Sequence, residues 1–451
     1  MNSKQSTIAA IATPPGDGGV AIIRLSGSEA VAFANPIFSK NILQFESHKL
    51  YLGSILNSDQ TVLDQGMLVV MKAPHSYTGE EVVEIHCHGG HFLSKKILKR
   101  VLDLGAQIAK PGEFTERAFL NGKMDLSQAE AVQTLISAKN DYALKSATEQ
   151  LDGSLSKKIK TLQKDLIESA AVLEAWVDFP EEGIEYMSLQ ELTHALQSVQ
   201  NEMKALIESY EHGRILHLGF TLCLVGKPNV GKSSLMNALL KKERALVTPI
   251  AGTTRDTLEE ALLIEGISYR LIDTAGIRQT DELVEKMGIE RASKSIQEAD
   301  LILFVLDSSA PLTQEDKDLI TKLKDQKVLV LWNKSDLKQV KQEEHPFKET
   351  LQISAQSGNG LDLLYRRIPE LLMGELNLTD QIYLTEIRHK NALEEANKLL
   401  ENVICGLQKE ASPEWLTFDL KSCLRSLSSI IGMDITENIL SSIFSKFCIG
   451  K

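Results

Sequence analysis

The chain has 451 residues, about three times the size of a common domain, so the sequence predicts two to four domains. With 43% hydrophobic and 24% charged residues, the composition is that of a folded protein that can bury several cores, which excludes a largely disordered chain. There are 49 Lys and Arg against 61 Asp and Glu. The resulting net charge of -12 argues against a protein that holds nucleic acid mainly by non-specific attraction to phosphates, although it leaves room for a local basic patch.

The cysteines and the apolar runs indicate the compartment. The five cysteines are odd in number, lie far apart and show no C-x-x-C spacing, so neither a disulfide framework nor a zinc module is predicted. The longest apolar runs, such as residues 301–306, are far shorter than the ~20 residues that span a bilayer, and residues 1–15 lack the pattern of a signal peptide. These features predict a cytoplasmic protein with no membrane partner.

Residues 1 to about 120 alternate short apolar runs with glycine and proline. This pattern predicts strands over residues 19–25, 66–71 and 81–87 and a helix over residues 92–104. The expected N-terminal domain is therefore of the α+β class.

From Asp125 onward, apolar residues recur every three or four positions, which predicts long helices with one apolar stripe. Gly153 suggests a break between two of these helices. Ser188 and Glu191 form an S-x-x-E capping box, which predicts the start of a further helix, and Gly213 is placed to end it.

After residue 214 the pattern changes to apolar strands that alternate with helices, at residues 218–225, 269–272, 301–306, 328–332 and 351–353. Strands with this spacing predict βαβ units and a mainly parallel sheet. The helical period returns after about residue 377, so we expect this α/β block to be inserted into one helical domain whose two halves pack together.

The strongest local signal is the G-x-x-x-x-G-K-S loop at residues 226–233, which follows an apolar strand and precedes a helix-forming run. Its glycines let main-chain N–H groups turn towards phosphate oxygens, Lys232 neutralises phosphate charge, and the Ser233 hydroxyl is the expected magnesium ligand. The sequence therefore predicts a P-loop nucleotide site.

Three further elements follow in the order expected of a GTPase. The D-x-x-G element at residues 273–276 can reach magnesium through water and meet the γ-phosphate. The N-K-x-D element ends at Asp336, whose carboxylate can accept two N–H groups of guanine, and residues 354–355 would close over the base. The predicted GTP-binding residues are Asn229, Val230, Gly231, Lys232, Ser233, Ser234, Thr248, Pro249, Ile250, Ala251, Gly252, Thr253, Thr254, Asp273, Thr274, Ala275, Gly276, Asn333, Lys334, Asp336, Ser354 and Ala355.

Hydrolysis needs a group that orients the attacking water. Many GTPases place a glutamine directly after the D-x-x-G element, but here that residue is Ile277, which cannot orient water. Glu285 is the candidate replacement, and a solvated glutamate at a helix start is the alternative. Thr254 is the expected second magnesium ligand. Arg255 is either an arginine finger or a partner in an exposed salt bridge.

Two further features leave alternatives open. Glu84, His86 and His88 lie on one face of a predicted strand, which allows a metal site, but a polar small-molecule pocket or an interface suits their spacing better. Cys448 near the end of the chain is either a buried, inert cysteine or a thiol held near a ligand.

Taken together, these motifs resemble the MnmE (TrmE) family of tRNA-modification GTPases over nearly the whole chain. Apart from the GTPase elements, the matching segments are T-P-P-G at 13–16, G-G-V at 18–20, S-Y-T-G-E at 76–80, H-G-G at 88–90, P-G-E-F at 111–114, R-A-F-L-N-G-K at 117–123 and C-I-G-K at 448–451.

The resemblance implies a multidomain protein of the α/β and α classes. Its α+β N-terminal domain (1–120) would dimerise and bind a reduced folate, either formyl- or methylene-tetrahydrofolate. A helical domain (121–213 and 377–451) would be interrupted by an inserted Ras-like P-loop GTPase domain (214–376). The family forms a 5-carboxymethylaminomethyl or aminomethyl group on the wobble uridine of certain tRNAs, together with the FAD-containing partner MnmG in a hetero-oligomer.

The resemblance also implies the ligands of each site, by position in this sequence. The folate site would be lined by Arg24, Glu84, Lys123 and Lys451. Potassium would be held by Asn229, Thr248, Ile250 and Thr253, and magnesium by Ser233 and Thr254. The potassium ion would take the place of an arginine finger and Glu285 would position the water. A chemical role for Cys448 stays open.

Two rival functions remain at this point. A ribosome-assembly GTPase would use the same nucleotide elements but would leave the N-terminal domain and the C-terminal C-I-G-K unexplained. A folate-dependent transferase that acts alone, with the GTPase as a switch, would not need the FAD-containing partner.

Overall fold

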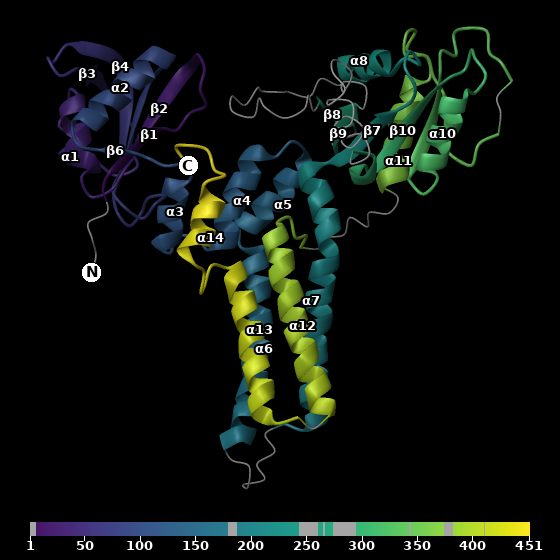
Figure 1. Ribbon diagram of the computed structural model, residues 1–451. Coiled ribbons are helices and arrows are strands. Elements are labelled where there is room, and N and C mark those ends of the chain that lie inside the picture. Colours follow the sequence, from purple (N-terminus) through teal and green to yellow (C-terminus); the bar gives the residue numbers. More distant parts are fainter. Residues whose placement is uncertain are drawn as a thin grey trace, which may run out of the picture. The chain divides into compact units, whose positions relative to one another are not determined.

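The protein is described by a computed structural model that covers residues 6–178, 187–242, 260–264, 267–273, 295–341, 344–373, 382–409 and 411–451 (Figure 1). The chain divides into two compact units. Unit 1 comprises Met1–Ile136, Thr148–Asn201 and Ala392–Lys451, and unit 2 comprises Ser137–Ala147 and Glu202–Asn391.

Unit 1 contains a six-stranded sheet with the order β3-β4-β5-β2-β1-β6. All neighbouring strands are antiparallel except β1 and β6, which are parallel. The strands and the helices of this part are β1 (Ile8–Ile11), β2 (Gly18–Ser26), β3 (Tyr51–Leu56), β4 (Val62–Met71), β5 (Val82–Gly89), β6 (Gln107–Ile108), α1 (Ala30–Ala34), α2 (His91–Asp103) and α3 (Glu113–Leu120).

This sheet is covered by apolar residues of α2. Ile97 and Val101 of α2 are fully buried in one core with Ile23, Val83 and Ile85 of the sheet. The alternation of buried residues along β2 and β5 is the period-2 pattern of a sheet with one face in a core. The predicted α+β class of this domain is therefore confirmed.

The helical part of the chain joins segments that are far apart in the sequence. The helices that follow the N-terminal sheet domain and the inserted block are α4 (Leu126–Ser137), α5 (Asp141–Leu151), α6 (Ser154–Asp178), α7 (Leu189–Leu218), α12 (Ile387–Gln408), α13 (Pro413–Ile430) and α14 (Glu437–Phe444). The helices α5, α7 and α12 lie only partly in unit 1. Figure 1 shows α6 and α13 side by side, and the Gln163 Nε2 of α6 donates to the Ser428 Oγ of α13 at 2.8 Å. The expectation that the two halves of the helical domain pack together is confirmed.

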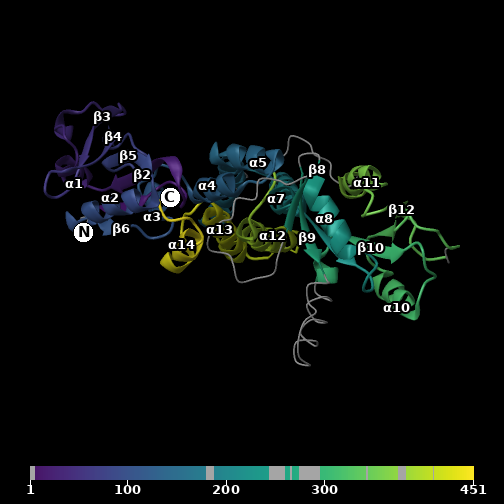
Figure 2. The same ribbon diagram turned by 90° about the horizontal axis from the view of Figure 1, so that it is seen from above.

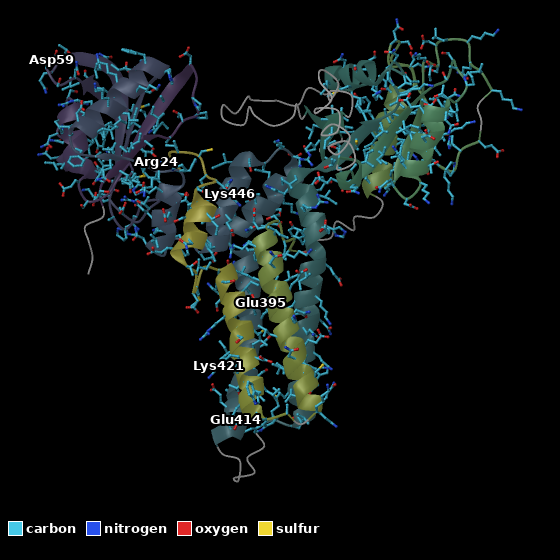
Figure 3. All side chains as sticks on the ribbon, viewed as in Figure 1. Arg24, Asp59, Glu395, Glu414, Lys421 and Lys446 are labelled. Atoms are coloured by element: carbon cyan, nitrogen blue, oxygen red, sulfur yellow. The ribbon has the colours of Figure 1, made fainter. Side chains whose placement is uncertain are left out.

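The packing of α6 against α13 follows from their apolar stripes. Leu162 and Leu166 of α6 and Leu420 and Leu427 of α13 have no exposed surface. Lys421, which Figure 3 labels on α13, lies with its Nζ 2.7 Å from Glu174 Oε1 of α6. Because both of these charged side chains are about half exposed, their ion pair adds little, and burial of the leucines supplies most of the stabilisation.

The start of α7 confirms the predicted capping box, but its end corrects the prediction. Ser188 Oγ accepts a hydrogen bond from the Glu191 N–H at 3.2 Å, and the Ser188 N–H donates to Glu191 Oε2 at 2.9 Å. Gly213 does not end the helix, because α7 continues to Leu218 and Gly219, with φ +80°, takes the left-handed position after it.

Gly213 is instead a site of close approach. A Cβ added there would lie 2.0 Å from the carbonyl oxygen of Leu384, so only glycine lets this backbone pass α7. Gly153 acts as predicted: with φ +82° it separates α5 from α6.

Unit 2 contains a second six-stranded sheet with the order β12-β11-β10-β7-β9-β8. All neighbours are parallel except β8 and β9. Its elements are β7 (Phe220–Val225), β8 (Glu260–Ile264), β9 (Ile267–Asp273), β10 (Leu301–Asp307), β11 (Val328–Asn333), β12 (Thr350–Gln352), α8 (Lys232–Lys242), α10 (Gln314–Leu323) and α11 (Leu361–Met373).

Helices lie on both sides of this second sheet (Figure 2), and residues of both its faces are buried in hydrophobic cores. Alternate residues of β10 enter different cores: Leu303 packs with Leu235 of α8, whereas Phe304 packs with Leu323 of α10. A strand that is buried on both faces has a continuous run of apolar residues in its sequence. For this reason β10 and β11 could be predicted. The mainly parallel α/β block is thus confirmed, whereas the predicted strand at 218–225 begins too early, since Leu218 is still helical.

Among the described residues, no helix is both long and apolar enough to span a membrane.

Replacing Gly213 by alanine tests the close approach. Alanine gains about 1 kcal/mol of helix propensity over glycine. We expect a net loss of stability of about 1–3 kcal/mol nevertheless, because the new Cβ must push the Leu384 backbone away. Scanning calorimetry of the intact protein measures the loss, with the exposed Asn201→Ala on the same helix as the control. Equal or higher stability of Gly213→Ala would contradict this assignment.

Candidate functional site

The loop between β7 and α8 has the backbone of an anion cradle. Gly226, Asn229 and Gly231 have φ values of +154°, +62° and +98°. A Cβ on Gly226 would lie 2.4 Å from Val305 O, and one on Gly231 would lie 2.2 Å from Asn333 Nδ2, so both positions require glycine. In the sheet, β7 has β9 on one side and β10 on the other, so the strand order reverses at β7. Ligands of parallel α/β sheets usually bind at the carboxyl end of the strands at such a point, which is where this loop lies.

Lys232 and the first turn of α8 complete this cradle. Lys232 is 8% exposed, and its Nζ donates to the carbonyl oxygens of Gly226 and Lys227, both at 2.7 Å. Ser233 and Ser234, on the same turn, are exposed. A helix N-terminus with a lysine ammonium group beside it favours a polyphosphate as the ligand.

Asn333 joins this loop to two other predicted segments. Its side chain is nearly fully buried at the end of β11; Nδ2 donates to Val230 O at 2.7 Å and Oδ1 accepts from the Ala355 N–H at 2.9 Å. Ser354 is fully buried, and its Oγ accepts from the Ser357 N–H at 3.1 Å. The predicted residues 226–233, 333–336 and 354–355 therefore lie together at the carboxyl edge of the sheet.

Lys334 and Asp336 are placed differently in the turn after β11. Lys334 has φ +64°, and its Nζ lies 2.6 Å from Asp307 Oδ2. Burial raises the pKa of Asp307, but hydrogen bonds from Lys334 and Ser309 outweigh it, so the pKa is lowered and the carboxylate stays ionised. Asp336 is exposed, and its carboxylate makes no hydrogen bond or ion pair with any described residue, so it can accept from a ligand.

Several predicted residues lie outside the described parts of the chain. These are Thr248, Pro249, Ile250, Ala251, Gly252, Thr253, Thr254, Arg255, Thr274, Ala275, Gly276, Ile277 and Glu285. Asp273 is the last residue of β9, and only its backbone is described.

Sequence reasoning missed two acidic residues that hold lysines of this site. Asp307 is the last residue of β10 and pairs with Lys334 at 2.6 Å, and Asp316 of α10 pairs with Lys227 at 2.6 Å. The only local signal for Asp316 is the T-x-x-D capping box at Thr313. The sequence does not reveal which lysine each carboxylate meets, since the partners are 27 and 89 residues apart.

A second polar site lies on the N-terminal sheet. Arg24 of β2 pairs across the sheet with Glu84 of β5, and its Nε lies 2.7 Å from Glu84 Oε1. A second guanidinium nitrogen, Nη1, donates to Gly450 O at 3.2 Å, which brings the C-terminal segment to this pair. Glu84 Oε2 also lies 3.3 Å from His86 Nε2.

Charged groups of both signs meet in this second site. Burial and the nearby Arg24 charge lower the pKa of Lys451, because the two cations lie close together. Burial raises the pKa of Glu84, but His86 and Arg24 outweigh it, so the pKa is lowered and the carboxylate is ionised. Lys123 is exposed and donates to Pro74 O at 3.0 Å, and no hydrogen bond or ion pair among the described residues joins it to Arg24, Glu84 or Lys451.

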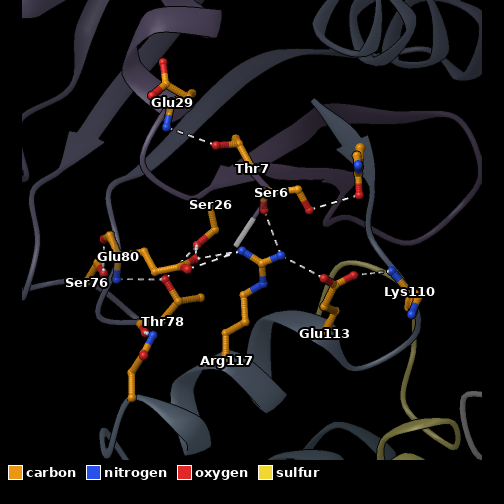
Figure 4. Close-up of polar contacts among 12 residues, drawn as sticks. Ser6, Thr7, Ser26, Glu29, Ser76, Thr78, Glu80, Lys110, Glu113 and Arg117 are labelled. Carbon is orange, nitrogen blue, oxygen red and sulfur yellow. Dashed lines mark hydrogen bonds and ion pairs between the residues drawn. The ribbon is translucent and has the colours of Figure 1, made fainter. Parts of the chain in front are cut away.

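A buried arginine holds the segments beside this site (Figure 4). Arg117 is 3% exposed; its Nη1 lies 3.2 Å from Glu80 Oε2 and its Nη2 lies 2.8 Å from Glu113 Oε1. Glu80 also accepts from Ser26 Oγ at 2.6 Å. Two carboxylates around one buried guanidinium fix the position of the S-Y-T-G-E segment relative to α3.

A metal site at Glu84, His86 and His88 receives no support. No group of three or more His, Cys, Asp or Glu side chains in the described ranges could hold a metal ion. His88 instead points to a neighbouring strand, where its Nδ1 lies 2.7 Å from Asp64 Oδ1.

The cysteines fall into two classes. Cys87, Cys223 and Cys423 are buried, whereas Cys405 and Cys448 are exposed. The reading of Cys448 as a buried cysteine is therefore wrong, because the neighbouring Phe447 takes the buried position. Burial raises the pKa of the Cys87 thiol to about 11 and that of Cys423 to about 12.

Comparison with known proteins covers almost the entire chain. A family model described as "MnmE helical domain" matches residues 126–448, and one described as "GTP-binding protein TrmE N-terminus" matches residues 7–123. Among curated proteins, "tRNA modification GTPase MnmE" of Protochlamydia amoebophila is 50% identical over 448 residues, which is 99% of this chain and 97% of that protein. Proteins with the same description from Lachnoclostridium phytofermentans and Clostridioides difficile are both 44% identical and cover 99% of this chain, and 100% and 99% of their own lengths.

The two classes of cysteine predict the course of thiol labelling. At pH 8, a thiol of pKa 11 is about 0.1% thiolate and one of pKa 12 about 0.01%, against about a quarter for an ordinary exposed thiol. We expect a chromogenic disulfide reagent to modify Cys405 and Cys448 within minutes and the other three only after denaturation. Mass spectrometry of tryptic peptides assigns the sites, and protection of Cys448 in the native protein would contradict its exposed position.

Proposed function

Because this chain belongs to the MnmE family of tRNA modification GTPases, we propose that it hydrolyses GTP to GDP as part of tRNA modification. The observation that carries the proposal is the joining of three segments at one sheet edge. There Asn333 connects the glycine-rich loop that carries Lys232 to Ala355, and Asp336 follows in the same turn. No simple phosphate-binding loop needs the second and third of these segments.

In this proposal each described residue has a defined task. The main-chain N–H groups of the loop and the Lys232 ammonium hold the β- and γ-phosphates, and Ser233 ligates magnesium. The Asp336 carboxylate accepts two N–H groups of guanine, and Asn333 keeps the phosphate and base subsites at a constant separation. The remaining proposed contacts are those of the GTP-binding set given above.

Hydrolysis is proposed to depend on potassium and on Glu285. Asn229, Thr248, Ile250 and Thr253 would hold the potassium ion, and Thr254 with Ser233 would hold magnesium. Of these, Asn229 lies exposed in the loop with φ +62°, a position from which its side chain can reach a ligand. The potassium charge would take the role of an arginine finger, worth about 10³–10⁵ in rate, while Glu285 orients the water.

The N-terminal polar site is proposed to bind a reduced folate, formyl- or methylene-tetrahydrofolate. The close cations Arg24 and Lys451 suit the carboxylates of such a molecule, and the ionised Glu84 suits the N–H groups of its ring. When bound, the folate would supply a one-carbon unit. Lys123 would line the same site, and the exposed Cys448 is near enough along the chain to act there, chemically or structurally.

The substrate and partners complete the proposal. With the FAD-containing partner MnmG, a homodimer of this cytoplasmic chain would form the 5-carboxymethylaminomethyl or aminomethyl group on the wobble uridine of certain tRNAs. GTP turnover would drive a rearrangement of the domains, which we place at 1–120, 121–213, 214–376 and 377–451. The alternative, a ribosome-assembly GTPase, leaves the Arg24, Glu84 and Lys451 site without a purpose.

Asp336→Asn tests guanine recognition. An amide keeps one acceptor but loses the charge and presents a donor, so it suits xanthine, which has a carbonyl group where guanine has its exocyclic amine. We expect kcat/KM for GTP to fall by about 10²–10³ and that for xanthosine triphosphate to rise. Asp325→Asn, an exposed residue elsewhere in the same unit, is the control. Unchanged selectivity would remove Asp336 from the base site.

Mass spectrometry of nucleosides from bulk tRNA tests the function as a whole. We expect cells that lack this gene to lose the 5-substituted wobble uridines, the intact gene to restore them and Lys232→Ala to fail. Lys322→Ala, an exposed residue of α10, should restore them fully. An unchanged nucleoside profile would favour the ribosome-assembly alternative.

A further inference from the structure

Lys227, the second residue of the glycine-rich loop, reaches out of the loop to α10. Its Nζ lies 2.6 Å from Asp316 Oδ2 and donates to Thr313 Oγ1 at 3.3 Å. The Lys227 side chain is 18% exposed and that of Asp316 is 1% exposed, so this is a largely desolvated ion pair. The phosphate-binding pattern itself leaves the residue at this position open.

Asp316 is fixed independently of Lys227. It is the third residue of α10 and forms a capping box with Thr313, so Oδ2 accepts from the Thr313 N–H at 2.9 Å and from Thr313 Oγ1 at 2.7 Å. Its other oxygen, Oδ1, is buried and has no hydrogen-bond partner among the described residues. The rigid helix start thus presents one carboxylate oxygen to the loop, and Lys227 is the cation that balances its charge.

The main chain of Lys227 has a different partner. Its carbonyl oxygen accepts a hydrogen bond from Lys232 Nζ at 2.7 Å, as does Gly226 O at the same distance. If Lys232 turns to a phosphate, these two bonds are lost from the loop. The side-chain bond of Lys227 to Asp316 does not involve Lys232, so it is retained when Lys232 moves.

We propose that Lys227 and Asp316 form a positioning pair that holds the glycine-rich loop open for the nucleotide after Lys232 has left its carbonyl partners. This inference rests on the proposed GTPase function and adds two residues to it. Neither residue touches the reacting atoms. Their contribution is to keep the main-chain N–H groups of the loop directed at the phosphates, so they act on nucleotide retention rather than on the chemical step.

Removal of the pair should therefore separate KM from kcat. In Lys227→Met the loop loses its anchor and Asp316 keeps a buried, unbalanced charge. We expect the KM for GTP and the dissociation rate of GDP to rise about tenfold, since small misplacements of binding groups cost up to about 10²-fold, while kcat stays within about twofold.

The experiment compares four variants of the full-length protein by steady-state GTP hydrolysis and by stopped-flow release of a fluorescent GDP analogue. Lys227→Arg keeps the cation and should restore the wild-type KM. Asp316→Asn keeps the volume and should raise KM, and the double variant Lys227→Met/Asp316→Asn should be no worse than Lys227→Met alone, because both changes break one interaction. Lys322→Met on α10 is the matched surface control.

The outcomes distinguish this inference from the proposed function. If the wild-type protein neither binds the GDP analogue nor hydrolyses GTP, the proposed function is wrong. If the wild-type protein is active and Lys227→Met and Asp316→Asn both keep its KM and GDP release rate, the positioning pair is wrong. A general loss of fold would lower both the fraction of protein that binds nucleotide and the midpoint of unfolding. A selective rise in KM with an unchanged unfolding midpoint, reversed in Lys227→Arg, therefore distinguishes the positioning pair from a folding defect. If Lys227→Met does not fold, Asp316→Asn with Lys227→Arg decides the question.

Discussion

The candidate nucleotide site depends on the burial of the unit 2 sheet on both faces. Because alternate residues of β7 and β10 enter separate cores, neither face can turn to solvent, and helices must return the chain so that strands run parallel. Parallel strands end at one edge, so the loops after β7, β11 and β12 meet there although up to about 130 residues separate them. Asn333 then converts this proximity into a connected site, through one amide that bonds to both neighbouring segments.

The charged side chains of the two candidate sites have different kinds of partner. In unit 2, Lys227 pairs with Asp316 and Lys334 pairs with Asp307, and the Nζ of Lys232 donates to two carbonyl oxygens of its own loop. Lys227 and Lys334 therefore hold the main chain of the loop and of the turn in place. In the N-terminal domain, the buried Arg117 holds segments together, with Glu80 at its Nη1 and Glu113 at its Nη2. Arg24 of the same domain is paired with Glu84, and burial and the Arg24 charge lower the pKa of the nearby Lys451.

The helical domain shows how an inserted block can leave a fold intact. The stripe of α6 is complementary to that of α13, which follows more than 230 residues later in the chain, and the two helices pack as if consecutive. Closing so long a connection costs little more than closing a short one, since the entropy of loop closure grows only with the logarithm of length. The inserted unit also folds around its own core. The contact between α6 and α13 therefore does not have to offset the conformational entropy that the inserted unit loses on folding.

The features that depend on local chemistry could be predicted from the sequence alone. Continuous apolar runs predicted β10 and β11, the S-x-x-E box predicted the start of α7, and the glycine-rich loop predicted the phosphate cradle. The strands β1, β3, β6 and β8 were missed, since short strands such as β3, with only Ile55 fully buried, carry almost no alternation. Gly213 was misread because a glycine that ends a helix and one that admits a crossing backbone look alike until Leu384 is in place.

The partners of the charged side chains follow from the tertiary structure and not from the local sequence. The pairs Lys227 with Asp316 and Arg24 with the carbonyl of Gly450 join residues 89 and 426 positions apart. Local sequence constrains backbone conformation and burial, whereas pairing between distant side chains follows from strand order and helix packing, which arise from the whole chain.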